Sequence, residues 1–395
     1  MGKIKMNEKI FLSCPHLRGN EEKYVSECIR TEWISSAGKY VDQFENNLAK
    51  YVGARSAAAC MNGTAALHIC LILAGVERDE EVIVPALTFI SPVNTVRYVG
   101  AEPVFMDCDD YLNIDVDKLT EFLKTECKVT NKILSNKRTG RRIRTIIPVH
   151  VFGSLCAMDE LMALAEKYNL CVIEDATESL GSYMTTGKYK NQHSGTIGHF
   201  GCYSFNGNKI ITTGGGGMIV ANDNSLVEKA KYLTTQAKND PLHYIHDEVG
   251  YNYRMTSVQA AMGVAQMEQL PEFIERKEKN YNRYKELIKD IKGLRLLDVP
   301  DYCKSNYWFY SLFIDKEKYG LGRDELMMKL ENEGIQTRPI WKLNNRQKPY
   351  INNQAYMIEK ADYYFEHILN IPCSVGLTDE ELERVVEALK DSAAE

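Results

Sequence analysis

Hydrophobic and polar positions change period repeatedly along the first two-thirds of the chain. Short apolar runs such as "EVIVP", "EPVFMD" and "LCVIEDA" are separated by segments with helical spacing. Strands of a parallel sheet have continuous apolar runs of this kind because helices cover both of its faces. The pattern therefore predicts an α/β layered domain, and in such domains ligands bind at the carboxyl ends of the strands.

The helical segments between these runs have predictable limits. We expect helices over residues 64–74, 115–124 and 158–168, the first ending at Gly75. Each helix follows one apolar run and precedes another. This order indicates βαβ units rather than antiparallel hairpins.

The last third of the chain has a different pattern. It predicts a long helix interrupted near Pro271, a strand over residues 306–314 and a helix that ends near Gly334. A terminal helix follows, with Thr378 as N-cap and Glu381 in the capping-box position. We therefore predict two domains, a large one over residues 1–255 and a smaller α+β domain over residues 256–395.

The composition excludes several classes of protein. The 395 residues are 44% hydrophobic and 26% charged, which is typical of a globular chain, and a formal charge of −6 gives no electrostatic footprint for nucleic acid. No stretch approaches membrane-spanning length, and the N-terminal apolar run is too short for a secretory signal. We expect a cytoplasmic protein with no membrane partner.

Cysteine is abundant, but its spacing is not that of a metal site. None of the eleven cysteines forms Cys-x-x-Cys, and several lie in apolar runs. They are interpreted as buried thiols, and no metal is expected. The most basic tract, Asn136 to Arg144, is interpreted as a solvated loop between a helix and a strand rather than a phosphate or nucleic-acid contact.

One lysine stands beside the longest glycine run, in "SFNGNKIITTGGGGM". Glycine admits positive φ and lets the backbone approach a ligand closely. Lys209 could hold a phosphate as a point charge, or it could be a nucleophilic amine. The alternative is a hairpin with a solvated lysine at its turn.

Two further motifs suggest what surrounds this lysine. Gly63 and Thr64, in "NGTAAL", stand where a strand ends and a helix begins, which is a natural phosphate seat. Glu174, Asp175 and Glu178, in "VIEDATES", end a buried strand and are expected to face the ligand crevice. Taken separately, the first motif is also a common helix cap, and Asp175 could simply cap the next turn.

Together, these features describe a pyridoxal-phosphate site. The cofactor requires an amine, an acid beside its ring nitrogen and donors for its phosphate. Lys209, Asp175 and the Gly63–Thr64 helix start would supply them in this order and spacing. We therefore predict pyridoxal 5'-phosphate as cofactor, alternating with pyridoxamine 5'-phosphate.

At this point the sequence resembles the DegT/StrS-type nucleotide-sugar aminotransferases, a branch of the aspartate-aminotransferase fold type. The resemblance covers nearly the whole chain and rests on an ordered set of motifs, chiefly "NGTAAL", "VPALTFISPVN", "PVHVFG", "VIEDATES", "YSFNGNKIITTGGGGM", "GYNYRMTSVQAAMG" and "TRPIW". It implies a three-layer fold with a mostly parallel central sheet and a smaller C-terminal domain. It also implies a homodimer whose active sites are shared between subunits.

The resemblance also implies roles for single residues. Lys209 would be the Schiff-base lysine and Asp175 the partner of the pyridine nitrogen. The phosphate would be held by Gly63, Thr64 and Ser204 of one subunit and by Asn252 of the other. The remaining implied contacts are Phe89 on the ring face, Glu178 beside the cofactor's O3′, and His150 as a residue that orients Asp175. By pattern alone, the alternative for both Phe89 and His150 is a core residue.

Two departures from the family pattern concern neighbouring positions. Gly214 to Gly217 are all glycine where many members carry an acid, and Gly198-His199 replaces a common Gly-Asp. Neither removes a group that performs chemistry. Members with histidine in place of the lysine perform dehydration, and Lys209 argues against that reaction.

The resemblance implies transfer of an amino group from glutamate to a nucleotide-linked keto sugar. The members most like this chain act on C4 of UDP-4-keto-6-deoxy-N-acetylhexosamines, in pathways to legionaminic-type or bacillosamine-type sugars. Trp33, Ser35 and Arg338 are candidate substrate contacts. The alternatives are 3-amination of a dTDP-keto-hexose and a pyridoxal-phosphate-binding regulator without catalysis.

Overall fold

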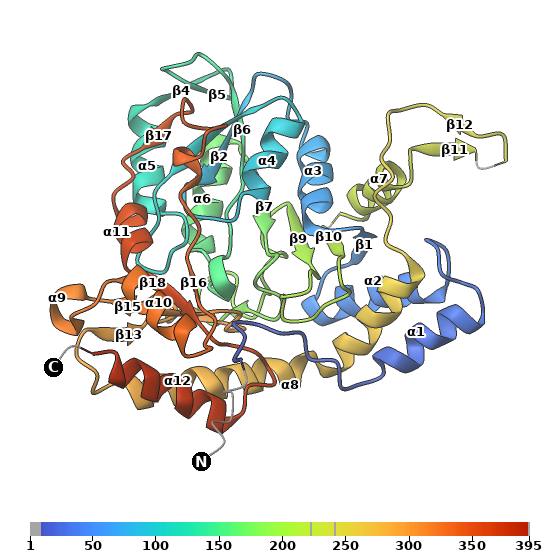
Figure 1. The fold of residues 1–395 in the computed structure, drawn as a ribbon. Coiled ribbons are helices and arrows are strands. Elements are labelled where there is room, and N and C mark those ends of the chain that lie inside the picture. The colour runs from blue at the N-terminus through green and yellow to red at the C-terminus, as the bar shows by residue number, and fades with distance from the viewer. Residues whose placement is uncertain (1–8, 222, 241, 394–395) are drawn as a thin grey trace.

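A mixed eight-stranded sheet forms the centre of the structure, a computed structural model that describes residues 9–221, 223–240 and 242–393 (Figure 1). In spatial order its strands are β1 (Ser56–Cys60), β10 (Gly217–Ala221), β9 (Phe200–Ser204), β7 (Cys171–Asp175), β6 (Ile143–Ile146), β2 (Glu81–Pro85), β3 (Glu102–Met106) and β17 (Ala355–Tyr356). Neighbouring strands from β9 to β17 are parallel. Strand β10 is antiparallel to both of its neighbours, β9 and β1. The prediction of a mostly parallel α/β sheet is confirmed.

Helices cover both faces of this sheet and make it a three-layer structure (Figure 1). Alternate residues of β2 divide between the faces, because successive side chains of a strand point in opposite directions. Val82 and Val84 pack with α3 (Gly63–Leu73), α4 (Ser91–Tyr98) and α7 (Asn224–Thr234). Ile83 packs on the other face, with α5 (Val116–Thr125) and α6 (Met158–Tyr168). The predicted helices 64–74, 115–124 and 158–168 are confirmed within one residue.

The long helix α8 (Ser257–Ile288) runs without interruption through Pro271, so the predicted break is wrong. Proline inside a helix costs about 3 kcal/mol, because it removes a hydrogen bond and crowds the preceding turn. Leu270 and Phe273 flank the exposed Pro271 and are almost fully buried against α2 (Lys39–Val52) and its neighbours. Burying two large apolar side chains offsets that cost.

A second, four-stranded sheet lies in the C-terminal part of the chain. Its order is β13 (Leu294–Leu296), β15 (Tyr310–Ile314), β18 (Ile368–Ile371) and β16 (Arg338–Pro339), with α10 (Arg323–Asn332) and α12 (Asp379–Asp391) in the same core. The capping box of Thr378 and Glu381 is confirmed. The strand predicted over 306–314 begins only at Tyr310. The domain boundary at residue 256 stays a prediction.

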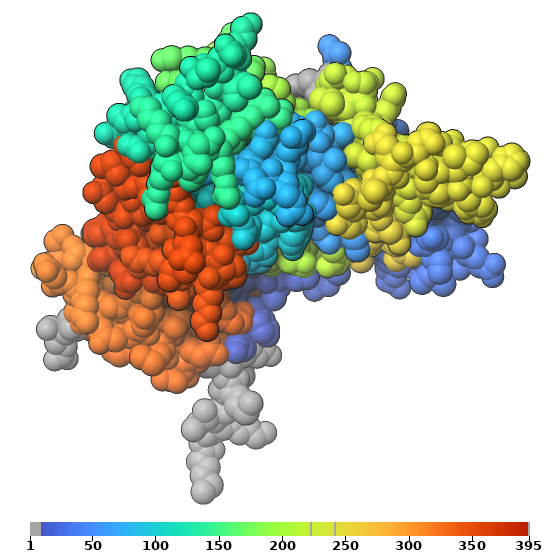
Figure 2. Space-filling view, turned by 90° about the horizontal axis from the view of Figure 1, so that it is seen from above, coloured from blue at the N-terminus to red at the C-terminus, as the bar shows by residue number. Residues whose placement is uncertain are grey.

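Shorter elements connect and extend these two sheets. They are α1 (Glu21–Arg30), the pair β4 (Cys127–Thr130) and β5 (Ile133–Asn136), η1 (Val151–Gly153), β8 (Tyr183–Met184) with β14 (Cys303–Lys304), the pair β11 (Lys238–Asp240) and β12 (Ile245–His246), α9 (Lys316–Tyr319), η2 (Asn344–Arg346) and α11 (Lys360–His367). The arm that carries β11 and β12 projects from the body in both views (Figures 1 and 2).

The basic tract and the cysteines both have structural roles. The tract joins β5 to β6 rather than a helix to a strand, because an unpredicted hairpin precedes it, and Arg144 forms an ion pair with Glu80 at 2.9 Å. All eleven cysteines are free thiols, and nine are buried as predicted, whereas Cys14 is exposed and Cys171 is only partly buried. Within residues 9–221, 223–240 and 242–393, no helix is both long and apolar enough to span a bilayer.

Candidate active site

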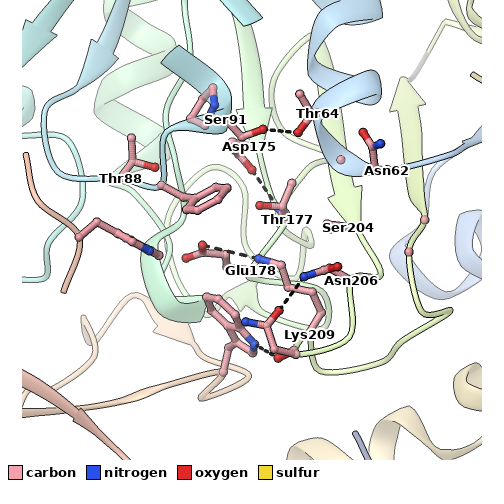
Figure 3. Close-up of a pocket in the computed structure, with 18 of the residues that line it drawn as sticks. Asn62, Thr64, Thr88, Ser91, Asp175, Thr177, Glu178, Ser204, Asn206 and Lys209 are labelled. Atoms are coloured by element: carbon pink, nitrogen blue, oxygen red, sulfur yellow. Dashed lines mark hydrogen bonds and ion pairs between the residues drawn. The ribbon is translucent and has the colours of Figure 1, made fainter. Parts of the chain in front are cut away.

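A cavity of about 430 Å³ opens where β7 and β9 end (Figure 3). The first turns of α3 and α4 form one wall, and the loops after β7 and β9 form another. Three aromatic residues from the C-terminal part of the chain, Trp308, Phe309 and Trp341, complete the lining. The cavity therefore lies at the carboxyl edge of the sheet, where the sequence predicts a ligand site.

Seven of the predicted site residues line this cavity: Gly63, Thr64, Phe89, Asp175, Glu178, Ser204 and Lys209. The structure does not bring the other four to the single-chain cavity. Trp33 is 60% exposed beside a separate hollow, and Ser35 is exposed with its carbonyl bonded to the Ser257 N–H. Asn252 and Arg338 are exposed as well. Their proposed contacts with cofactor or substrate stay predictions.

Lys209 lies in the connection between the antiparallel strands β9 and β10, but it is enclosed, so the alternative of a solvated lysine at a hairpin turn is wrong in its solvation. Its side chain is 12% exposed, and its Nζ lies 3.6 Å from Oε1 of Glu178, whose side chain is 2% exposed (Figure 3). Burial lowers the pKa of Lys209, and burial raises the pKa of Glu178 to about 7. A buried amine of lowered pKa beside an acid that titrates near neutrality is suited to proton transfer.

We expect a Glu178→Gln substitution to change how stability depends on pH. Glu178 binds its proton more tightly in the folded chain, with a pKa of about 7, than at its ordinary value of 4.5. The free energy of unfolding therefore decreases as pH rises through this interval. Between pH 4.5 and 7 the cofactor-free parent should lose about 3 kcal/mol relative to the variant, measured by urea unfolding.

The exposed Glu272→Gln substitution on α8 is the matched control for this measurement, because it removes the same charge from the surface. Parallel stability curves for the parent and Glu178→Gln would mean that Glu178 is ionised throughout the interval.

Asp175 ends β7 and is buried beneath the cavity (Figure 3). Its Oδ1 accepts a hydrogen bond from the Thr177 N–H at 3.1 Å, so it does cap the turn that follows. Burial raises the pKa of this carboxyl group. Asp175 also lines the cavity, so its carboxyl group can contact a cationic ligand atom while it caps the turn.

Glu174 and His150 belong to the framework behind the cavity, which corrects two predictions. As a strand neighbour of Asp175, Glu174 points to the opposite face and does not line the cavity. It accepts hydrogen bonds from the N–H groups of Gly195 and Ile197 and from Nε2 of His150, at 2.9, 2.7 and 2.9 Å. The His150 ring thus orients Glu174, and only its backbone N–H reaches Asp175.

Two helix N-termini meet at one end of the cavity. Helix α3 begins at Gly63, where the Asn62 side chain accepts the Ala65 N–H at 2.8 Å, and helix α4 begins at Ser91. The Thr64 and Ser91 hydroxyl groups are hydrogen-bonded to each other (Figure 3). Free N–H groups and the positive ends of two helix dipoles make this corner suitable for an anion such as phosphate.

The glycine run after Lys209 lets the backbone pass close to this corner. Gly214 has a φ of 77°, in the region that favours glycine. A Cβ on Gly217 would lie 2.4 Å from backbone atoms of Asn62, so no side chain fits there. The glycines thus allow the Lys209 loop and β10 to pack directly against the start of α3.

Several residues of the cavity were not predicted from the sequence. Thr88 is 1% exposed, and its hydroxyl group has no hydrogen-bond partner among the described residues. Trp308, Phe309 and Trp341 form an aromatic wall, and Phe89 is 52% exposed with its ring centroid 6.4 Å from that of Trp341. Phe89 is therefore not a core residue. The sequence signals for the wall are that two of the chain's three tryptophans lie in it and that Trp341 ends the "TRPIW" motif.

The residues present fit pyridoxal phosphate. The cavity offers a buried amine on Lys209, a buried acid on Asp175 and an anion corner at the start of α3. The unpartnered Thr88 hydroxyl and the half-exposed Phe89 ring are further contacts that a flat, polar-edged ligand would use.

Comparison with known proteins supports this assignment. The profile described as the DegT/DnrJ/EryC1/StrS aminotransferase family matches residues 15–390. EpsN of Bacillus subtilis (strain 168) is named as a candidate pyridoxal phosphate-dependent aminotransferase. It is 38% identical to this chain, over 97% of this chain and 96% of the EpsN chain. The GDP-perosamine synthase of Caulobacter vibrioides is 37% identical over 96% of this chain and 97% of its own.

Solved structures have the same fold. The structure of DesI in the presence of its TDP-sugar product superposes with a TM-score of 0.85 at 26% sequence identity, over 97% of this chain and 93% of DesI. The match to all three proteins extends over nearly their whole length.

Proposed function

This chain belongs to the DegT/DnrJ/EryC1/StrS aminotransferase family, and from that premise we propose that it is a pyridoxal-phosphate-dependent nucleotide-sugar aminotransferase. The observation that carries the proposal is the convergence of Lys209, Asp175 and the α3 N-terminus on one cavity. We further propose that it transfers an amino group from glutamate to C4 of a UDP-linked 4-keto-6-deoxy-N-acetylhexosamine. The product would be a UDP-4-amino-4,6-dideoxy sugar for a bacterial surface glycan, made in the cytoplasm.

Bound pyridoxal phosphate supplies a carbonyl carbon that receives the amino group and a ring that takes up an electron pair when a proton leaves carbon. Gly63 and Thr64 at the start of α3, together with Ser204, would hold its phosphate. Asp175 would hold the ring nitrogen, because a buried carboxylate stabilises a proton on that atom. Phe89 would cover a face of the ring.

Lys209 has two functions in this proposal. Its amine would be the covalent anchor of the cofactor. Once released, the same amine would remove a proton from the donor carbon in the first half-reaction and deliver a proton to the acceptor carbon in the second. A lowered pKa favours the neutral amine that both functions require. Glu178 forms an ion pair with Lys209 at 3.6 Å, and with a pKa near 7 it would accept and return the lysine's proton once the two groups close to hydrogen-bonding distance.

A panel of nucleotide keto sugars tests the proposed substrate. The pyridoxamine form of the enzyme is mixed with UDP-, GDP- and dTDP-linked keto sugars, and return of the visible absorbance of the aldehyde form is followed. The GDP- and dTDP-linked sugars are included because one relative is named GDP-perosamine synthase and the DesI structure was obtained in the presence of a TDP-sugar product. We expect the fastest return with the UDP-linked 4-keto sugar, and mass spectrometry with NMR of the product gives the aminated carbon.

A faster return with a dTDP-linked 3-keto-hexose would replace the proposed substrate by the second candidate. No return with any sugar, in a protein that binds pyridoxal phosphate on Lys209, would favour a regulator without catalysis.

The proposed homodimer predicts complementation between two inactive variants. Asn252 is exposed and outside the cavity of its own chain, and we propose that it reaches the phosphate bound by the partner subunit. In a heterodimer of Lys209→Ala and Asn252→Ala subunits, one site carries both lesions and the other carries neither. After subunit exchange, activity should rise to about one quarter of the parent's, since half of the dimers are mixed and each has one intact site.

Subunit exchange is verified separately with differently tagged chains. Complete exchange without recovery would mean that Asn252 acts within its own chain or has no part in the site. Mixing Lys209→Ala with Asp175→Asn is the matched control. Both residues act in the cavity of their own chain, so each site of the mixed dimer carries one lesion, and this mixture should not recover whether or not Asn252 crosses the interface.

A further inference from the structure

We propose that Trp308 is a positioning residue that holds the Lys209 ammonium group on its ring face and fixes the backbone beside it. The proposal rests on the proposed role of Lys209 as the reactive amine. Nζ of Lys209 lies 4.0 Å from the centroid of the Trp308 ring, and Trp308 is 3% exposed. A cation over a desolvated indole ring is attracted by the ring quadrupole, and tryptophan is the strongest such partner.

The same side chain also holds the Lys209 loop. Nε1 of Trp308 donates a hydrogen bond of 2.7 Å to the carbonyl of Asn208, the residue before the lysine. One rigid indole thus contacts the Lys209 amine with its ring face and the Asn208 carbonyl with its N–H group. Trp308 therefore fixes both ends of Lys209, its backbone and its amine, relative to the C-terminal part of the chain.

A buried asparagine connects Trp308 to the acid on the other side of the amine. Asn306 is 0% exposed, and its Oδ1 accepts the backbone N–H of Trp308 at 2.9 Å. Its Nδ2 donates to the backbone carbonyls of Glu178 and Leu180, both at 3.0 Å. Trp308 and Glu178 are thus held at a fixed separation with Lys209 between them. The Glu178 carboxylate and the Trp308 ring are therefore two contacts that favour the charged form of the amine, in a cavity whose burial opposes it.

The charged groups around Lys209 come from three elements. Glu178 and Asp175 favour the ammonium form, while burial opposes it. Lys277 of α8 lines a small second cavity that Lys209 and Trp308 also line. The ring of Trp308 is therefore one contribution among several, and its effect must be measured on the titration of Lys209 itself.

Competitive acetylation across a pH series, read by mass spectrometry of the peptide that contains Lys209, gives this titration in the full-length, cofactor-free protein. Trp308→Phe keeps a ring face, whereas Trp308→Leu and Trp308→Met provide similar volume without one. We expect the Lys209 midpoint to be lower in the Leu and Met variants than in the Phe variant, by about half to one pH unit. Comparing these variants with one another removes the common effect of the space left by the indole.

Trp341→Leu is the matched control, because Trp341 lines the same cavity, whereas the Lys209 ammonium lies over the ring of Trp308. Its midpoint should equal the parent's. Equal midpoints in the Phe, Leu and Met variants would overturn the ring contact. The Met variant replaces the Leu variant if the latter does not fold, since methionine fills irregular space readily.

The hydrogen bond to Asn208 has a separate measurement. Trp308→Phe lacks the indole N–H, so amide hydrogen exchange in the peptide 206–211 should become faster than in the parent, while exchange elsewhere in the sheet stays unchanged. Unchanged exchange in that peptide would overturn the backbone contact.

Borohydride trapping of pyridoxal phosphate on the same samples separates this proposal from the proposed function. Label on a lysine other than Lys209 would remove the proposed function and leave the titration result standing. Label on Lys209, together with equal midpoints in the variants, would remove only the role of Trp308.

Discussion

Replacing Lys209 by alanine should lower the rate of amino transfer by about 10⁴-fold or more, because one substitution removes both the covalent anchor and the proton carrier. The protein should keep its fold, since the side chain contributes one ion pair and one ring contact to the cavity. Borohydride reduction and peptide mapping of the yellow parent should place pyridoxal phosphate on Lys209. The variant should carry no covalent label on that peptide.

Lys209→Arg separates chemistry from charge. The guanidinium keeps a positive charge beside Glu178 and near the Trp308 ring, but it is not deprotonated in proteins and cannot act as an amine. We expect it to be as inactive as Lys209→Ala. An arginine variant that retains a substantial fraction of the parent's rate would mean that Lys209 acts only as a fixed charge.

Asp175→Asn should lower the rate by about two to three orders of magnitude while some cofactor stays bound. Removing one partner of a buried charge pair costs roughly 3–5 kcal/mol, and the amide has no negative charge for a protonated ring nitrogen. The substitution is structurally mild. The asparagine oxygen can still accept the Thr177 N–H, so the capping of the turn is preserved.

Steady-state kinetics with saturating cofactor and the melting temperature together decide this result. A near-normal rate in a folded Asp175→Asn protein would mean that Asp175 is only a cap. Thr177→Ser is the control, because it keeps both the backbone N–H and the hydroxyl group that Asp175 accepts. Its rate should stay within a few-fold of the parent's, as expected for a substitution that leaves the charge in place.

The sequence by itself determined the central sheet and the core of the site. Continuous apolar runs indicated strands covered on both faces, and the structure has them in a sheet that is parallel from β9 to β17. The motifs at the ends of β1, β7 and β9 predicted Gly63, Asp175 and Lys209 as neighbours, because parallel strands bring their carboxyl ends to one edge. Local pattern is sufficient where each residue lies at the end of its own strand or in the loop that follows it.

Local pattern failed where distant packing decides the outcome. Pro271 predicts a break, yet α8 is continuous because Leu270 and Phe273 bury their side chains on either side of it. His150 was expected beside Asp175, but the alternation of side chains along β7 places Glu174 on the His150 face instead. Both corrections follow from contacts between segments that the sequence does not place together.

Only the tertiary structure identified the environment of the reactive amine. Trp308 lies 99 positions after Lys209 in the chain, and nothing in "NYWFY" distinguishes a core aromatic from one that contacts a lysine. The pKa values of Lys209 and Glu178 likewise depend on desolvation, which requires the whole cavity wall to be in place. The sequence thus determined which groups meet at the sheet edge, and the folded chain decided the burial, partners and charge with which they meet.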